Sequence, residues 1–165
     1  MNKNFRYHID VLTVVTDQDY KEILRLLREL HSKYVFYIDI ERIKGIIDAP
    51  NKMIFVAKGA TEDSTEDHIV GLILCSICET LSLKKIILSD LVVCEQHRNK
   101  GVARLLFKRA FDFGKHINGD VLELLVRRNN ATAIALYETF EFDKPDYMYM
   151  RKILKRWTKK EIENG

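Results

Sequence analysis

The hydrophobic pattern of this chain switches between a period of two and a helical period, which predicts alternating strands and helices. Apolar or alternating runs predict strands over 10–16, 52–58, 68–80, 86–93, 121–126 and 146–154. Helical spacing predicts helices over 20–31, 40–47, 131–140 and a segment that starts near Val102. The order β-α-α-β-β-β-α-β-α, followed by closing strands, predicts an α/β fold built on a mixed sheet.

Two polar segments complete this pattern. The acidic stretch 59–67 joins two predicted strands, and we expect an extended hairpin loop there. Its carboxylates suit either a solvated loop tip or the steering of a cationic substrate. The C-terminal segment 155–165, which is basic overall, is expected to form a frayed tail. Because no repeat or linker is visible, we predict a single domain over 1–165.

The composition narrows the class of protein. With 47% hydrophobic and 31% charged residues and a net charge of +3, the sequence resembles those of soluble globular domains. It has no apolar run of membrane-spanning length, and residues 1–10 lack the apolar core of a secretory signal. We therefore expect a cytoplasmic protein without a membrane partner. A nucleic-acid partner is disfavoured, because Glu161 and Glu163 interrupt the C-terminal basic cluster. That cluster comprises Lys152, Lys155, Arg156, Lys159 and Lys160.

The three cysteines, Cys75, Cys78 and Cys94, are an odd number, which argues against a disulfide scaffold. Cys75 and Cys78 match the C-x-x-C spacing of redox and zinc sites. They lie in a predicted strand, however, where residues three apart point to opposite faces. The sequence has no second cysteine or histidine pair at zinc-finger spacing. We therefore expect small core residues and no metal.

The segment 84–108 carries the main chemical signal. It predicts a strand, a polar turn and then a helix start at Gly101 and Val102. A glycine there permits close approach of the backbone to a ligand, and the unpaired N–H groups of a helix start attract anions. This bend is a candidate phosphate cradle.

Two ordered motifs in this region resemble those of the GNAT superfamily of N-acetyltransferases. The first is Leu91-Val92-Val93 followed by Arg98-x-x-Gly101-x-Ala103, and the second runs from Asn130 through Tyr137 to Phe142. The resemblance implies a GNAT fold, a mostly antiparallel mixed sheet flanked by helices, with the fourth and fifth strands splayed. It also implies direct acetyl transfer from acetyl-coenzyme A to a primary amine, with the coenzyme-binding core at about 84–142.

The resemblance assigns coenzyme contacts residue by residue. The main chain of Leu91 and Val93 would lie along the pantetheine, and the amides from Arg98 to Arg104 would hold the pyrophosphate. One or two of Arg98, Lys100, Arg104 and Lys108 would reach the 3′-phosphate, although all four could form an ordinary solvated face. The implied coenzyme-binding set is Leu91, Val93, Arg98, Asn99, Lys100, Gly101, Val102, Ala103, Arg104, Asn130 and Tyr137.

The catalytic assignments are less complete. Tyr137 matches the family tyrosine that protonates the departing thiolate, although it could also be a core residue. Relatives often place a base where this chain has Ile87, Ser89 or Leu125, which cannot act as one. Asp90 and Glu123 are the nearest carboxylates, but Asp90 should point to the opposite face unless a bulge turns the strand. A water chain or deprotonation in bulk solvent remains an alternative.

Two different roles compete with direct acetyl transfer. An acyl-cysteine route through Cys94 is disfavoured, and a non-catalytic acyl-coenzyme A sensor or scaffold is the rival to the enzyme. Ala103 and Glu141 occupy positions where glycine is usual in the family. The acceptor wall would lie in 31–47, and its aromatic and acidic residues suit a small amine, a peptide N-terminus or a lysine. These residues are Tyr34, Phe36, Tyr37, Asp39 and Glu41. A homodimer is possible.

Overall fold

The computed structural model describes residues 7–31, 38–61, 64–146, 148–152 and 154. The described residues up to Leu125 form one compact unit, and those from Val126 onward form a second. The first unit holds the whole of the described sheet and all helices but the last.

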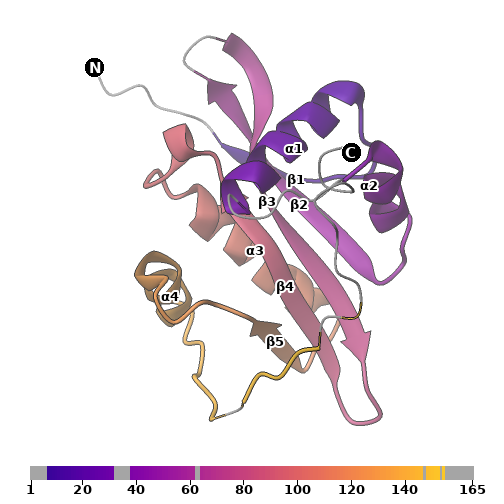
Figure 1. The fold of residues 1–165 in the computed structure, drawn as a ribbon, viewed down its shortest axis with the longest axis vertical. Coiled ribbons are helices and arrows are strands. Elements are labelled where there is room, and N and C mark those ends of the chain that lie inside the picture. The colour runs from indigo at the N-terminus through magenta and orange to yellow at the C-terminus, as the bar shows by residue number, and fades with distance from the viewer. Residues whose placement is uncertain (1–6, 32–37, 62–63, 147, 153, 155–165) are drawn as a thin grey trace. The chain divides into compact units, whose positions relative to one another are not determined.

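A five-stranded sheet runs through the first unit in the order β1-β2-β3-β4-β5 (Figure 1). All neighbouring strands pair antiparallel except β4 and β5, which are parallel. This is the predicted mixed α/β sheet, largely antiparallel. The strands are β1 (His8–Val11), β2 (Lys52–Thr61), β3 (Ser64–Glu79), β4 (Lys84–Val93) and β5 (Val121–Leu124).

The helices begin where polar residues can satisfy their first N–H groups. In α1 (Asp17–Leu30), Thr16 and Asp19 form a reciprocal capping box, and in α2 (Ile40–Ile47) the Asp39 side chain accepts from the Arg42 N–H. The predicted bounds of α2 are confirmed, and α1 starts slightly before its predicted range. The remaining elements are the short 3₁₀ turn η1 (Glu95–His97), α3 (Val102–His116) and, in the second unit, α4 (Ala131–Glu138).

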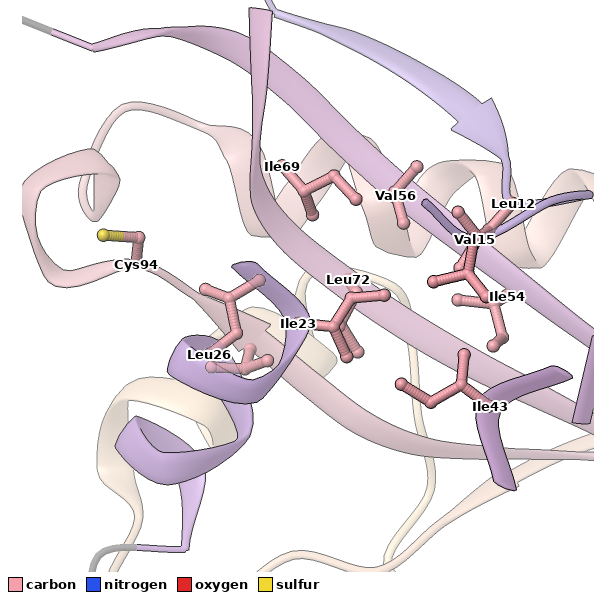
Figure 2. Close-up of a cluster of buried hydrophobic side chains, with 11 residues drawn as sticks. Leu12, Val15, Ile23, Leu26, Ile43, Ile54, Val56, Ile69, Leu72 and Cys94 are labelled. Atoms are coloured by element: carbon pink, nitrogen blue, oxygen red, sulfur yellow. The ribbon is translucent and has the colours of Figure 1, made fainter. Parts of the chain in front are cut away.

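One face of the sheet packs against α1 and α2. Figure 2 shows Ile23 and Leu26 of α1 and Ile43 of α2 directed toward Leu72 and Ile54 of the strands. The cluster also includes Cys94, directly after β4, so the start of the loop behind β4 is anchored in the core. Burial of such side chains contributes roughly 1.5–3 kcal/mol each before conformational entropy is subtracted.

The other face of the sheet packs against α3. The rings of Phe55 on β2 and Phe113 on α3 meet edge to face at 5.6 Å between centroids. Ile86 of β4 is completely buried on this side, close to Gly114 of α3. The sheet thus lies between two helical layers, and α3 starts beside the end of β4.

Two predicted segments differ clearly in extent from the structure. The first strand is shorter than 10–16, because Val14 is exposed and Thr16 already caps α1. The predicted loop 59–67 is largely strand, with β2 continuing to Thr61 and β3 starting at Ser64. Main-chain pairing needs no apolar side chains, so a polar hairpin can extend beyond the core.

The predicted closing strand 146–154 is wrong, because none of the described residues in that range forms a strand. Met148, Tyr149, Met150 and Leu154 are all exposed. None of the described large hydrophobic side chains in this segment is therefore buried, and alternation alone does not supply a strand partner.

The two cysteines of the C-x-x-C pair point apart, as predicted from their position in β3. Cys75 is completely buried and Cys78 is exposed. Among the described residues, no group of three or more His, Cys, Asp or Glu side chains could hold a metal ion. In the same part of the chain, no helix is both long and apolar enough to cross a membrane.

Candidate active site

Strands β4 and β5 stay paired only at their beginnings. The pairing runs from Lys85 with Val121 to Leu88 with Leu124, where β5 ends, whereas β4 continues to Val93. We call the part of β4 beyond this pairing, Ser89–Val93, the open edge. A strand that extends past its neighbour offers main-chain N–H and C=O groups to a ligand.

A β-bulge interrupts β4 at the start of the open edge. Leu74 of β3 pairs with Ser89, but Leu72, only two residues away, pairs with Val92. Two steps along β3 thus match three along β4, and Asp90 has a left-handed φ of 52°. A bulge is the condition under which we expected Asp90 to leave the face opposite the site.

The main chain of Val93 points away from β3. Because the N–H of the next residue, Cys94, donates to Val70 O at 2.8 Å, alternation turns the Val93 N–H toward the open edge. Leu91 lies two residues earlier on the open edge, directly after the bulge residue Asp90. The Val93 carbonyl accepts a hydrogen bond from Arg98 Nε at 2.9 Å. The open edge therefore offers the Val93 N–H as a hydrogen-bond donor, whereas the Val93 carbonyl already accepts a hydrogen bond from Arg98.

The start of α3 has the geometry of an anion cradle. Gly101 caps the helix in the left-handed conformation, with φ 82°, and makes no side-chain cap hydrogen bond. Asn99, two residues earlier, is also left-handed at 59°. The main-chain hydrogen bonds of the helix begin with the one from Leu105 N to Gly101 O, at 3.1 Å. The N–H groups of Val102 and Ala103 precede it, in the first turn, where a helix supplies no acceptor of its own.

A glutamate on α1 holds the loop between β4 and α3. Glu29 Oε2 lies 2.8 Å from Arg98 Nη2 and accepts a hydrogen bond from the Glu95 N–H at 3.1 Å. With its bond to Val93 O, Arg98 thus spans the loop from β4 to α1. The Arg98 side chain serves as a brace, so any coenzyme contact of this residue would use its amide.

The other cations differ in their surroundings. Lys108 pairs with Asp112 one turn along α3, at 2.6 Å. Lys100 and Arg104 are exposed near the helix start. Arg98 and Lys108 thus each have a carboxylate partner within the protein.

The two candidate bases have different partners. Asp90 Oδ1 lies 3.7 Å from Nε2 of His31, the residue that ends α1. Glu123 lies on β5 opposite Ile87 of β4, and its Oε1 is 2.8 Å from Lys85 Nζ. Because its carboxylate is bound by a lysine, Glu123 is the weaker candidate for removing a proton from an incoming ammonium group.

The predicted acceptor wall is only partly described. Asp39 caps α2, and Glu41 lies 2.7 Å from Lys44 Nζ, so both carboxylates have structural partners. The predictions on Tyr34, Phe36 and Tyr37 fall outside the described residues.

The second unit carries Asn130 and Tyr137. Asn130 Oδ1 accepts the Ala133 N–H at 3.2 Å and so caps α4. Burial raises the pKa of the Tyr137 phenol above its usual value near 10. Its ring lies 6.1 Å from that of Phe142, centroid to centroid. The phenol therefore stays protonated near neutral pH and can donate a proton.

The structure brings most of the predicted coenzyme residues together. Leu91, Val93 and the 98–104 segment follow one another along the open edge and around the cradle. Glu29, which sequence reasoning did not assign to the site, and His31, which it did not consider for catalysis, lie at its border. His31 appeared only as the first residue of the acceptor wall, and Glu29 looked like any charged position on an amphipathic helix.

The fold is that of known acetyltransferases. An aminoglycoside acetyltransferase from an uncultured soil metagenomic sample, meta-AAC0020, superposes with a TM-score of 0.74 at 17% identity, over 92% of this chain and 97% of the other. A putative acetyltransferase from Agrobacterium tumefaciens gives 0.72 at 19% identity, over 88% and 99%. AAC(6′)-Iy in complex with the bisubstrate analogue CoA-S-monomethyl-acetylneamine gives 0.67 at 15% identity, over 90% and 99%. No curated protein matches the sequence significantly.

A match to a family profile adds evidence of common ancestry to this similarity of fold. The profile of the acetyltransferase (GNAT) family matches residues 17–142, which include both sequence motifs. The chain belongs to the GNAT family and is an acetyl-coenzyme A-dependent acetyltransferase, as the motifs implied. The open edge and the glycine-capped helix start fit an extended, amide-bearing ligand that ends in a pyrophosphate.

Proposed function

We propose that this protein transfers the acetyl group of acetyl-coenzyme A directly to a primary amine. The observation that supports this most is the continuity of the open edge of β4 with the cradle at Gly101. Together they suit a ligand with amides along its length and negative charge at one end.

The residues of the chain would divide the work between binding and chemistry. The Val93 N–H would hold an amide of the pantetheine arm, and the N–H groups of Val102 and Ala103 would hold the pyrophosphate. Bound acetyl-coenzyme A supplies an activated thioester. The protein then has to present a neutral amine to that thioester and to protonate the departing thiolate.

The assignments of acid and base complete the proposal. The Tyr137 phenol would give its proton to the leaving sulfur, and Asp90 would attract the ammonium form of the acceptor at the bulge. Holding the amine and thioester in line can contribute on the order of 7–11 kcal/mol to lowering the barrier. Much of the rate enhancement would therefore come from positioning by β4 and α3.

The acceptor class is proposed to be a small cationic amine. Asp90 is a carboxylate at the bulge, with its side chain 38% exposed, and would attract a positive group. Among proteins with the same fold, meta-AAC0020 is an aminoglycoside acetyltransferase and AAC(6′)-Iy binds an acetylneamine analogue, which makes this class the first to test. Peptide N-termini and lysine side chains remain in the same experiment as alternatives.

A thiol-release assay with acetyl-coenzyme A tests the proposal. The acceptor panel contains sisomicin, neamine, spermidine, amino acids and short peptides with a free N-terminus or lysine. We expect turnover with one class. Coenzyme binding without turnover of any acceptor would overturn direct amine transfer.

Gly101→Asp is the matched inactive control. An added Cβ at Gly101 would meet no atom within 4 Å, but at φ 82° any side chain strains the backbone by roughly 1–2 kcal/mol. The variant should fold with a slightly lower melting temperature, while its carboxylate repels the pyrophosphate. Loss of turnover in a variant that still unfolds cooperatively above the assay temperature would attribute the activity to the cradle.

A further inference from the structure

His31 gives the candidate site a titratable ring that neither motif contains. It is the C-cap residue of α1, and its Nε2 lies 3.7 Å from Oδ1 of Asp90 on β4. Both side chains are about one-third exposed, at 34% and 38%. Both side chains are therefore partly in contact with solvent, unlike those of a buried structural ion pair.

The bulge in β4 is what brings these two residues together. Ser89 and Val92 pair with Leu74 and Leu72 of β3, whose side chains lie on the α1 side of the sheet. The bulge inserts Asp90 between Ser89 and Val92, with φ 52°. A left-handed residue other than glycine costs roughly 1–2 kcal/mol. That strain is stored where β4 starts to extend beyond β5, next to the proposed place of the thioester.

The neighbouring residues on β4 offer no other base. Ile87 and Ser89 lie on the α1 side of the sheet, and neither side chain can take up a proton near neutral pH. Two residues before His31, Glu29 is directed to Arg98 at 2.8 Å, so these opposite charges largely offset one another. Arg28 is the other charged residue in the last turn of α1.

We propose that Asp90 binds the ammonium group of the acceptor and passes a proton from that group to Nε2 of His31. The proposal rests on the proposed amine acetylation. The ammonium N–H bond breaks, its electron pair remains on nitrogen as the nucleophile, and the proton ends on the imidazole ring. Asp90 is ionised before and after the step. The imidazolium beside it then releases the proton to water.

The division of labour follows from the chemistry of the two groups. A carboxylate attracts an ammonium ion strongly but is too weak a base to keep its proton near neutral pH. An imidazole takes and releases protons in that range. His31 thus acts through Asp90, and its removal should slow the chemical step without weakening the coenzyme's binding.

The test measures steady-state kinetics with whichever panel amine the wild-type protein acetylates fastest. His31→Ala should lower kcat by about 10²- to 10³-fold, while KM for acetyl-coenzyme A changes less than about twofold. Adding imidazole to the assay should restore at least about tenfold in this variant. Asp90→Asn should also lose activity, with no recovery in imidazole.

Controls separate the possible outcomes. His116→Ala, in the last turn of α3, should keep full activity and show no imidazole effect. His31→Gln keeps a polar side chain at the C-cap and replaces His31→Ala if that variant fails to fold. A wild-type kcat, or a loss that imidazole does not relieve in a folded variant, would overturn the relay. No wild-type turnover with any panel amine would overturn the proposed function itself.

Discussion

Glu29 on α1 and Arg98 behind β4 form a salt bridge of 2.8 Å that joins the α1 layer to the loop before α3. The same Glu29 oxygen accepts the Glu95 N–H, and Arg98 in turn donates to Val93 O. One carboxylate thus fixes both the end of the open edge and the approach to the cradle. His31, two residues along the chain, meets Asp90 at the other end of that edge.

Glu29→Ala should therefore raise KM for acetyl-coenzyme A by about fivefold, with kcat nearly unchanged. The pair is partly exposed, so we assign it about 1 kcal/mol rather than the value of a buried ion pair. Steady-state kinetics with varied coenzyme measures the effect. Asp112→Ala, which breaks the surface pair with Lys108, should leave KM unchanged. Equal changes in both variants would mean a general charge effect.

Gly71→Ala should destabilise the protein by roughly 1–3 kcal/mol through overpacking. A Cβ there would lie 2.9 Å from the Val92 carbonyl oxygen and 3.2 Å from Leu106 Cδ1. Gly45→Ala is the opposite case, because nothing lies within 4 Å and the residue is inside α2. It should stabilise by about 0.5–1 kcal/mol. Urea unfolding of both variants checks the pair, and destabilisation by Gly45→Ala would contradict this account of local space.

The parts of the fold that sequence predicted well are those that depend on local signals. The helical spacing of apolar residues predicted helices over 20–31 and 40–47, close to the observed bounds of α1 and α2. The glycine before Val102 marked the cradle. The segment 146–154 shows the limit, because an alternating pattern states which side chains could share a face without stating which strand would pair with them.

The arrangement of the site depends on contacts that local sequence does not encode. The bulge at Asp90 arises from the register of β4 against β3, so the sequence could state it only as a condition. Arg98 looked like a phosphate ligand because its partner Glu29 lies 69 residues away. His31 acquires its proposed role from the same kind of long-range contact.

Cys75 should make the protein less stable as the pH rises above 9. Burial raises the pKa of its thiol from 9.0 to about 12. Between these values the unfolded chain releases the proton and the folded chain keeps it, so the unfolded state binds fewer protons and stability falls. The slope approaches ~1.4 kcal/mol per pH unit.

Urea unfolding in reductant between about pH 7 and 10.5 measures this slope. Cys75→Ala should reduce this loss of stability at alkaline pH. The small cavity that the substitution leaves would lower stability equally at every pH and so would not change the slope. Cys78→Ala, at an exposed position of the same strand, should keep the wild-type slope. Identical slopes in all three proteins would show that Cys75 does not control the alkaline limb.

Glu141→Gly should stabilise the end of α4 by about 0.5–1 kcal/mol. Glu141 has φ 59°, and its N–H bonds to Glu138 O while the next N–H bonds to Tyr137 O, which is the hydrogen-bond pattern of a glycine-terminated helix. Thr139→Gly should instead destabilise, since Thr139 is right-handed at φ −70°. Slower amide exchange at Phe142 in the first variant and faster exchange in the second is the expected result.

Tyr137→Phe should lower kcat by about 10²- to 10³-fold and leave coenzyme affinity unchanged, if the phenol protonates the departing thiolate. The substitution keeps the ring that packs near Phe142 and removes only the hydroxyl. Because burial raises the Tyr137 pKa, the acid form persists through neutral pH, and this group should not limit activity there. Tyr149→Phe, at a position 65% exposed, is the control and should keep wild-type kcat. Equal kcat for the wild type and Tyr137→Phe would remove Tyr137 from the acid role and leave proton delivery to water.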